Sequence, residues 1–151
     1  MLMSDPFELA RQEIKRADHL LFVSLKYTRT VDVLKSIVER LINVYDASVS
    51  AVLEHALERK AIEKIPALAR QRLELLKTLH PQNDELRNFC ELYIILRKIS
   101  NARFDRSNEY RRHVTMTAHI DEEQIEITID IIRDYFDKTK EFVTFAEKLM
   151  T

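Results

Sequence analysis

The sequence predicts an all-α protein: an antiparallel up-and-down bundle of four main helices plus one short helix. Glycine is absent from all 151 residues, although average usage of roughly 7 % would give about ten. The absence excludes glycine-rich phosphate loops, dinucleotide-binding fingerprints and glycine hairpin turns. Apolar residues also recur at spacings of three and four over most of the chain, which is the periodicity of one helical face.

The composition predicts a single domain over residues 1–151. Apolar residues make up 46 % and charged residues 32 % of the chain, which is typical of a globular protein and not of a disordered one. The lone Cys90 allows neither an intrachain disulfide nor a cysteine-based zinc site, and it fits a reducing, cytoplasmic environment. No apolar stretch reaches about 20 residues, so no membrane span is expected.

The first helix is expected to begin at a capping box. Asp5-Pro6-Phe7-Glu8 provides an acceptor at the N-cap, proline in the first helical position and glutamate in the third. The helical spacing then continues to about residue 24 and falters over Tyr27–Thr30. Thr30 can cap a second helix at this point. A straight continuation is also compatible with the sequence, because the segment contains no strong helix breaker.

Three helices are expected in the middle of the chain. They cover about residues 31–57, 66–79 and 84–103, with Pro66 in the first turn of the second and Asn83 as the cap of the third. Several apolar residues of the chain's first helix and of the helix over residues 31–57 lie off the main apolar face. They predict a second packing surface and therefore a homodimer. These residues are Val23, Leu25, Val31, Val33, Ile42 and Val49.

The last helix is expected to start at a second capping box, Asp121-x-x-Gln124. The long connector Asn101–Ile120 separates it from the preceding helix and lacks a helical stripe. Within the connector, Val114-Thr115-Met116-Thr117 is rich in β-branched residues and is predicted to be extended. Connectors of this length are uncommon in small bundles and are often functional.

The connector is basic although the whole chain has a net charge of −1. Residues 97–119 carry six basic and two acidic side chains, a net charge of +4, whereas residues 120–151 carry four basic and nine acidic side chains, a net charge of −5. Phe104 and Tyr110 lie among the arginines, where aromatic rings can stack on bases or hold the loop against the bundle.

Other candidate chemistry is sparse. No histidine follows a glutamate by three residues, which excludes the carboxylate-bridged di-metal bundle. Glu54, His55 and Glu58 can share one helical face and hold a single ion, or form the polar edge of the helix. We favour the polar edge, and we expect neither a metal nor another cofactor. Cys90 falls on an apolar face and is expected in the core.

Arginines and histidines together can act on the phosphodiester of RNA. Arginine binds phosphate oxygens, histidine transfers a proton near neutral pH, and the 2′-hydroxyl of the substrate is the nucleophile. Such cleavage needs no metal. The connector contains the pair Arg112 and His119 with six residues between them, and a second pair, Arg106 and His113, with the same spacing.

The segment Arg112-His113-Val114-Thr115-Met116-Thr117-Ala118-His119, followed by a long last helix, resembles the signature motif of the HEPN superfamily. In that family an arginine, usually followed by a polar residue, precedes a histidine by four to six residues. The resemblance implies a HEPN-like bundle that dimerises with its motifs facing each other. It also implies a metal-independent endoribonuclease in which Arg112 and His119 are catalytic.

Three functions therefore stay open. The first is an RNA- or nucleotide-binding module, either toxin-type or, as the resemblance suggests, a partner of a nucleotidyltransferase. Its candidate binding residues are Arg106, Tyr110, Arg111 and His113. The second is the endoribonuclease. The third is a structural bundle that binds another protein, in which the arginines only form surface ion pairs with the acidic last helix. We favour the first.

Overall fold

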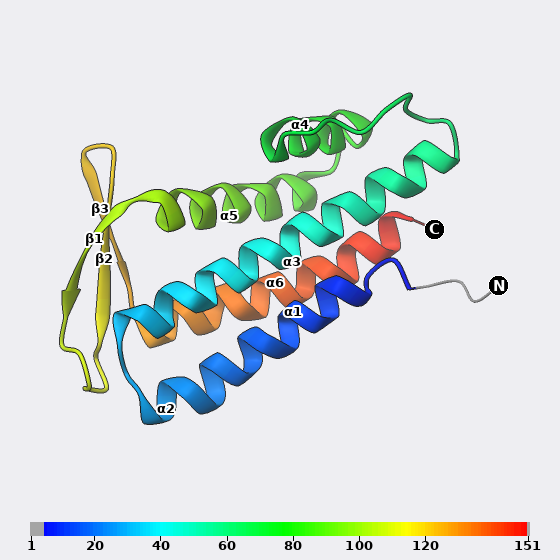
Figure 1. Cartoon of the computed structure of the whole chain (residues 1–151). Coiled ribbons are helices and arrows are strands. Elements are labelled where there is room, and N and C mark those ends of the chain that lie inside the picture. Colours follow the sequence, from blue (N-terminus) through cyan, green and yellow to red (C-terminus); the bar gives the residue numbers. More distant parts are fainter. Residues whose placement is uncertain (1–4, 151) are drawn as a thin grey trace.

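The computed structural model describes residues 5–150 and shows a helical bundle with a small sheet at one end (Figure 1). The elements, in chain order, are α1 (Glu8–His19), a π-helical segment (Leu20–Ser24), α2 (Leu25–Tyr27), α3 (Val31–Glu58), α4 (Ala69–Leu79), α5 (Asp84–Asn101), β1 (Arg103–Ser107), β2 (Thr115–Ile120), β3 (Glu123–Ile127) and α6 (Ile129–Leu149). The predicted helical bundle is confirmed, but the protein is mainly α and not all-α.

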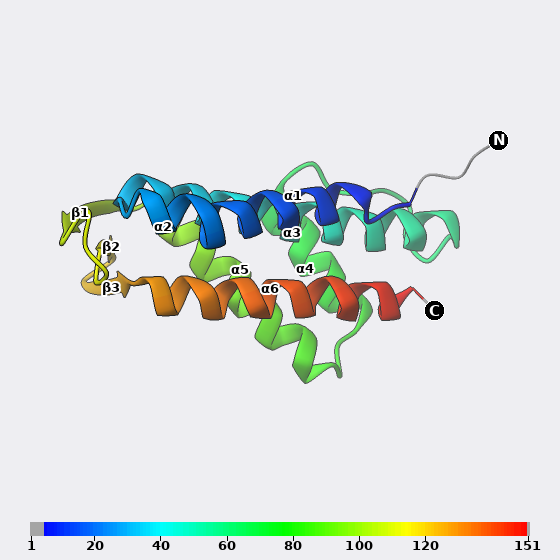
Figure 2. The same cartoon turned by 90° about the horizontal axis from the view of Figure 1, so that it is seen from below.

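The sheet lies at the opposite end of the bundle from the start of α1 and the end of α6, as both views show (Figure 1, Figure 2). Helix α3 is the centre of the bundle and contacts α1, α4, α5 and α6. No helix within residues 5–150 has the length and apolarity that a membrane crossing requires.

Most of the apolar residues that predict a second packing surface are buried in the core of the single chain. Val31, Ile42 and Val49 are buried, with at most 9 % of their surface exposed, and Leu25 before them is also buried. A helix that is surrounded by four others buries residues on most of its sides, so its apolar residues fill one core. Val33 is partly buried against the core. Val23 is 42 % exposed, next to Phe22 at 47 %. The apolar set thus gives no support to the predicted homodimer.

Two of the expected helix caps are confirmed, but the capping box at Asp5 is wrong. Helix α1 begins at Glu8, which was expected as the third helical residue, and Phe7 is at the N-cap without a side-chain cap bond. Asp5 Oδ1 accepts from the Phe7 N–H at 2.9 Å in the turn before the helix. Thr30 Oγ1 accepts a hydrogen bond from the Val33 N–H at 3.4 Å, and Asn83 Oδ1 accepts one from the Leu86 N–H at 2.9 Å. The backbone leaves the helical region at Thr28, so the turn at Tyr27–Thr30 is confirmed and the straight continuation is wrong. The short helix begins at Ala69, three residues later than the sequence suggested.

The predicted start of the last helix is wrong. Thr128 Oγ1 caps α6 by accepting from the Ile131 N–H at 3.2 Å, and the helix begins at Ile129. Asp121 lies instead in the turn between β2 and β3, and Gln124 pairs with His119 across the two strands. The physical reason is the alternation of polar and apolar residues over Glu123–Ile127, which suits a strand with one buried face.

The connector forms a three-stranded antiparallel sheet in the order β1-β2-β3. Met116 and Ala118 of β2 and Ile127 of β3 are fully buried, and β2 contacts both α3 and α5. The absence of glycine does not prevent these tight turns. Asn108 and Asp121 adopt positive φ angles of 55° and 56°, because asparagine and aspartate tolerate the left-handed region better than other non-glycine residues.

Candidate functional site

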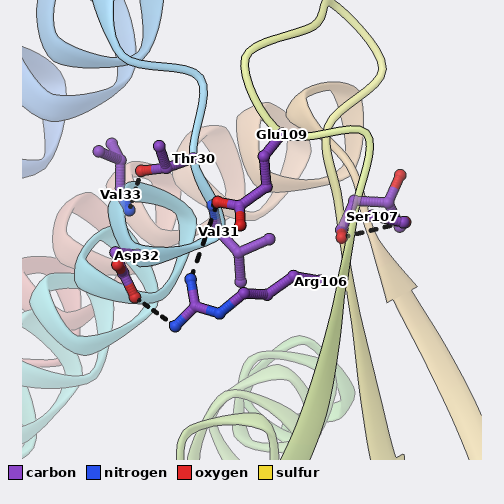
Figure 3. A network of polar contacts seen from close by, with 8 residues as sticks. Thr30, Val31, Asp32, Val33, Arg106, Ser107 and Glu109 are labelled. Atoms are coloured by element: carbon purple, nitrogen blue, oxygen red, sulfur yellow. Dashed lines mark hydrogen bonds and ion pairs between the residues drawn. The ribbon is translucent and has the colours of Figure 1, made fainter.

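The loop between β1 and β2 is fastened to the start of α3 by a polar network (Figure 3). Glu109 Oε2 accepts a hydrogen bond from the Val31 N–H at 3.1 Å, which satisfies a free backbone donor in the first turn of the helix. Arg106 Nη2 donates to Asp32 Oδ1 at 2.8 Å, and its Nη1 lies 3.8 Å from Glu109 Oε2. The backbone N–H of Tyr110 donates to the Arg29 carbonyl at 2.6 Å.

This network occupies Arg106, which the sequence had placed among the RNA-binding residues. The hydrogen bond from Arg106 lowers the pKa of Asp32 below its ordinary value, and the same bond raises the pKa of Arg106. Its guanidinium also lies over the ring of Phe104, with 5.3 Å between the guanidinium carbon and the ring centroid. Arg106 therefore joins the loop to α3, and Phe104 holds the loop rather than offering a free ring.

The rest of the loop faces solvent, and we call Tyr110, Arg111, Arg112 and His113 the tip. All four residues are exposed, and Tyr110 is 75 % exposed. Within residues 5–150 the side chains of the tip form no hydrogen bond or ion pair. Tyr110 also has a positive φ of 67°, an uncommon conformation for a bulky residue. Its hydrogen bond to Arg29 holds this conformation.

His119 lies at the other end of β2 from the tip. It pairs with Arg103 on β1 and with Gln124 on β3. Its Nε2 atom lies 2.7 Å from Asp105 Oδ2, so the carboxylate fixes the orientation of the imidazole ring. The four residue steps from Thr115 to His119 span about 13 Å of extended strand. The structure therefore does not bring Arg112 and His119 together within one chain.

His119 lines a cavity of about 580 Å³ between α4, α5 and the turn that joins β2 to β3. We call this cavity the His119 pocket. Three cationic side chains line it, Arg70 from α4 and Arg97 and Lys98 from α5, together with one carboxylate, Asp121. The rest of the wall is largely apolar. These residues lie on α4, α5, β2 and the following turn, so no motif with a fixed spacing could have predicted this pocket.

Arg97 is the one of these three cations whose orientation is held by neighbouring side chains in the described structure. Its Nη1 lies 3.3 Å from the Tyr93 hydroxyl and 3.7 Å from Asp46 Oδ1, and its guanidinium lies over the Tyr93 ring. The Tyr93 hydroxyl in turn donates to Asp46. Burial is the main cause that raises the pKa of Tyr93, which keeps the hydroxyl protonated. Arg70 and Lys98 form no hydrogen bond or ion pair within the described residues.

Neither Cys90 nor the group of Glu54, His55 and Glu58 forms a reactive or metal-binding site in the described residues. Cys90 is buried in the core as expected, and burial raises the pKa of its thiol to about 11, which makes it a poor nucleophile. Among residues 5–150, no group of three or more histidine, cysteine, aspartate and glutamate side chains is placed to hold a metal ion. This also applies to Glu54, His55 and Glu58.

Neither protein-family models nor curated proteins nor solved structures give a match to this chain. The resemblance to the HEPN superfamily therefore rests on the eight-residue motif and the helical layout. Membership of that family and the implied nucleotidyltransferase partner stay predictions. The tip and the His119 pocket are the two features of the described chain that offer cationic side chains to a ligand.

Proposed function

We propose that the protein binds single-stranded RNA through the tip. The observation that carries the proposal is the row of Arg111, Arg112 and His113 next to an exposed tyrosine ring, with every side chain free to contact a ligand. The loop that presents them is held at its base by Glu109 and by the Tyr110 backbone. A fixed backbone reduces the conformational entropy that is lost when a ligand binds.

The chemistry of the tip suits a polymer of phosphodiesters. Arginine can bind two oxygens of one phosphate, and an exposed tyrosine can stack on an unpaired base. The tip is an outward loop and offers no enclosure for a mononucleotide. Contacts to successive phosphates and one splayed base are therefore the mode of binding that it favours, and unpaired bases are more accessible in single-stranded RNA than in a duplex.

The charge distribution sets the strength of this binding. The whole chain is nearly neutral, with a net charge of −1, so long-range attraction to RNA is weak and the contacts are local. Each phosphate neutralised on a single strand contributes about 0.7 to the slope of the logarithm of affinity against the logarithm of salt concentration. Two arginines predict a contribution of about 1.4 to the slope.

The test compares two double variants in fluorescence-polarisation titrations of a labelled single-stranded RNA at several salt concentrations. In Arg111→Gln/Arg112→Gln we expect the affinity to fall about tenfold or more and the salt slope to fall by about 1.4. Arg59→Gln/Lys64→Gln removes two exposed charges near the end of α3 far from the sheet and should bind like the wild type. Equal losses in both variants would refute the tip as the binding surface.

The endoribonuclease can be separated from binding in the same samples. Its specific support is the orientation of His119 by Asp105, but Arg112 lies too far along the chain to share a phosphate with His119 in one molecule. RNA recovered after incubation in EDTA should be intact for the wild type. Metal-independent cleavage that is lost in both Arg112→Gln and His119→Gln would replace the binding proposal with catalysis, in which case two chains would have to combine their motifs.

A further inference from the structure

We infer that the His119 pocket is a second ligand site, which binds a phosphomonoester attached to an apolar group. This site is independent of RNA binding by the tip. The supporting observations are the cationic and apolar residues that line the cavity, and the absence of partners for two of the cations within residues 5–150.

The unpaired cations of the wall match a dianion. Arg97 already has Asp46 as its counterion, whereas Arg70 and Lys98 give two positive charges that have no partner among the described residues. A phosphomonoester carries about −1.5 to −2 at neutral pH. A phosphodiester or a carboxylate carries one negative charge and would compensate only one of these two cations.

The partners of the three cations indicate where the phosphate lies. Arg97 is held by Tyr93 and Asp46, so its guanidinium is pre-positioned before any ligand arrives. Arg70 and Lys98 have no partner among the described residues although they line the same cavity. Two unpaired cations beside a fixed guanidinium are the arrangement that a phosphate can complete.

The apolar residues of the wall indicate the rest of the ligand. Leu73 of α4, Ile94 of α5 and Ile120 of β2 line the cavity with apolar side chains. The volume of about 580 Å³ lies within the range of small-molecule sites, roughly 300–1,000 Å³, and is far larger than a free phosphate ion needs. An apolar group attached to the phosphate would therefore bury surface against these three residues.

The same phosphomonoester can belong to a free small molecule or to the 5′ end of an RNA. The two sources share the chemistry that the pocket recognises. The distance along β2 separates the pocket from the tip, so the pocket and the tip can be altered independently. Failure of one proposal then leaves the other intact and measurable.

The experiment titrates the full-length protein with phenyl phosphate and follows binding by calorimetry and by amide chemical shifts. We expect saturable binding of phenyl phosphate and chemical-shift changes at the amides of Leu73, Ile94 and Ile120. The affinity for inorganic phosphate should be at least about tenfold lower, because that ion lacks an apolar group. Arg70→Gln/Lys98→Gln should reduce phenyl phosphate affinity at least about tenfold. The matched charge control is again Arg59→Gln/Lys64→Gln, which should leave the affinity unchanged.

Three results would overturn the inference. They are the absence of saturable binding up to about 10 mM, equal affinity in Arg70→Gln/Lys98→Gln and the control, and chemical-shift changes confined to Arg111 and Arg112. The side chains of Arg70 and Lys98 form no hydrogen bond or ion pair with the part of the chain that the structure describes, so the double variant should unfold at the wild-type temperature.

A second arm of the experiment compares RNA with a 5′-phosphate and RNA with a 5′-hydroxyl. Preference for the 5′-phosphate that disappears in Arg70→Gln/Lys98→Gln supports an RNA end as the source, and no preference together with phenyl phosphate binding supports a free ester.

Discussion

The two ends of strand β2 carry the same residue types in different settings. At one end, Arg111 and Arg112 extend from an outward loop into solvent. At the other end, Arg70 and Lys98 reach a cavity from two helices, beside a guanidinium that is already fixed by Tyr93 and Asp46. An outward loop favours contacts along a polymer, whereas a cavity favours one small anion of defined charge and shape.

The difference shows that the position of a cation in the fold decides its use. Arg106 and Arg111 are five residues apart in the same basic connector, yet Arg106 is paired with Asp32 and Glu109 while the Arg111 side chain has no partner within residues 5–150. The net charge of residues 97–119 counts Arg106 and Arg111 equally and does not distinguish them. An arginine that finds a partner on α3 or α5 has a structural role, whereas an arginine without such a partner is available to bind a ligand.

The largest expected effect is a loss of unfolding free energy on substitution in strand β2, which joins the tip to the His119 pocket. Met116 lies midway along β2 and is fully buried. Met116→Ala should lower the free energy of unfolding by about 2–5 kcal/mol, because it removes packed atoms and leaves a cavity. Chemical denaturation measures this loss. Thr117→Ala, a partly buried neighbour on the opposite face, should cost about 1 kcal/mol or less. Equal losses in the two variants would show that the sheet is not packed as described.

The helices could be predicted from sequence because their signals are local. Thr30 and Asn83 act as caps through a hydrogen bond to a backbone N–H three residues further on, and such pairs are visible in the sequence as spacing. The start of α6 was missed for a related reason. Ile125 and Ile129 fit a helical spacing of four, but Ile125, Ile127 and Ile129 also fit the spacing of two that a strand requires.

The site could be predicted only where its residues are consecutive. The tip is a run of neighbours and is recognisable as basic and aromatic. The His119 pocket unites Arg70, Arg97 and His119 from α4, α5 and β2, and only tertiary packing brings such distant positions together. The burial of Ile42 and Val49 has the same origin, since a sequence does not reveal how many helices surround α3.

A smaller effect is expected where the loop end is fastened to α3. Glu109→Ala removes the acceptor for the Val31 N–H and a negative charge at the start of a helix, so it should cost about 1 kcal/mol of unfolding free energy. Glu122 lies in the other hairpin turn, is exposed and has no partner in the described residues. Glu122→Ala should change the unfolding free energy by less than about 0.5 kcal/mol. If both variants behave alike, Glu109 does not fasten the loop.

The smallest effect concerns Asp32 and tests directly whether Arg106 is free to bind RNA. The hydrogen bond from Arg106 lowers the pKa of Asp32 in the folded protein, so this contribution to stability is present above the unfolded pKa of the carboxyl and is lost as the pH falls through the folded value. Arg106→Gln should return the pKa of Asp32 towards its ordinary value, as an NMR titration of the Asp32 carboxyl would show.

Both groups are exposed, so the stability change itself should be small. The decisive measurement repeats the titration in the presence of saturating single-stranded RNA. If RNA contacts only the tip, Arg106 keeps its bond to Asp32 and the pKa of Asp32 stays low. If RNA draws Arg106 away, the pKa of Asp32 rises as it does in Arg106→Gln. The second result would extend the binding surface from the tip to β1, and would make the Asp32 pair a contact that RNA replaces rather than a fixed part of the fold.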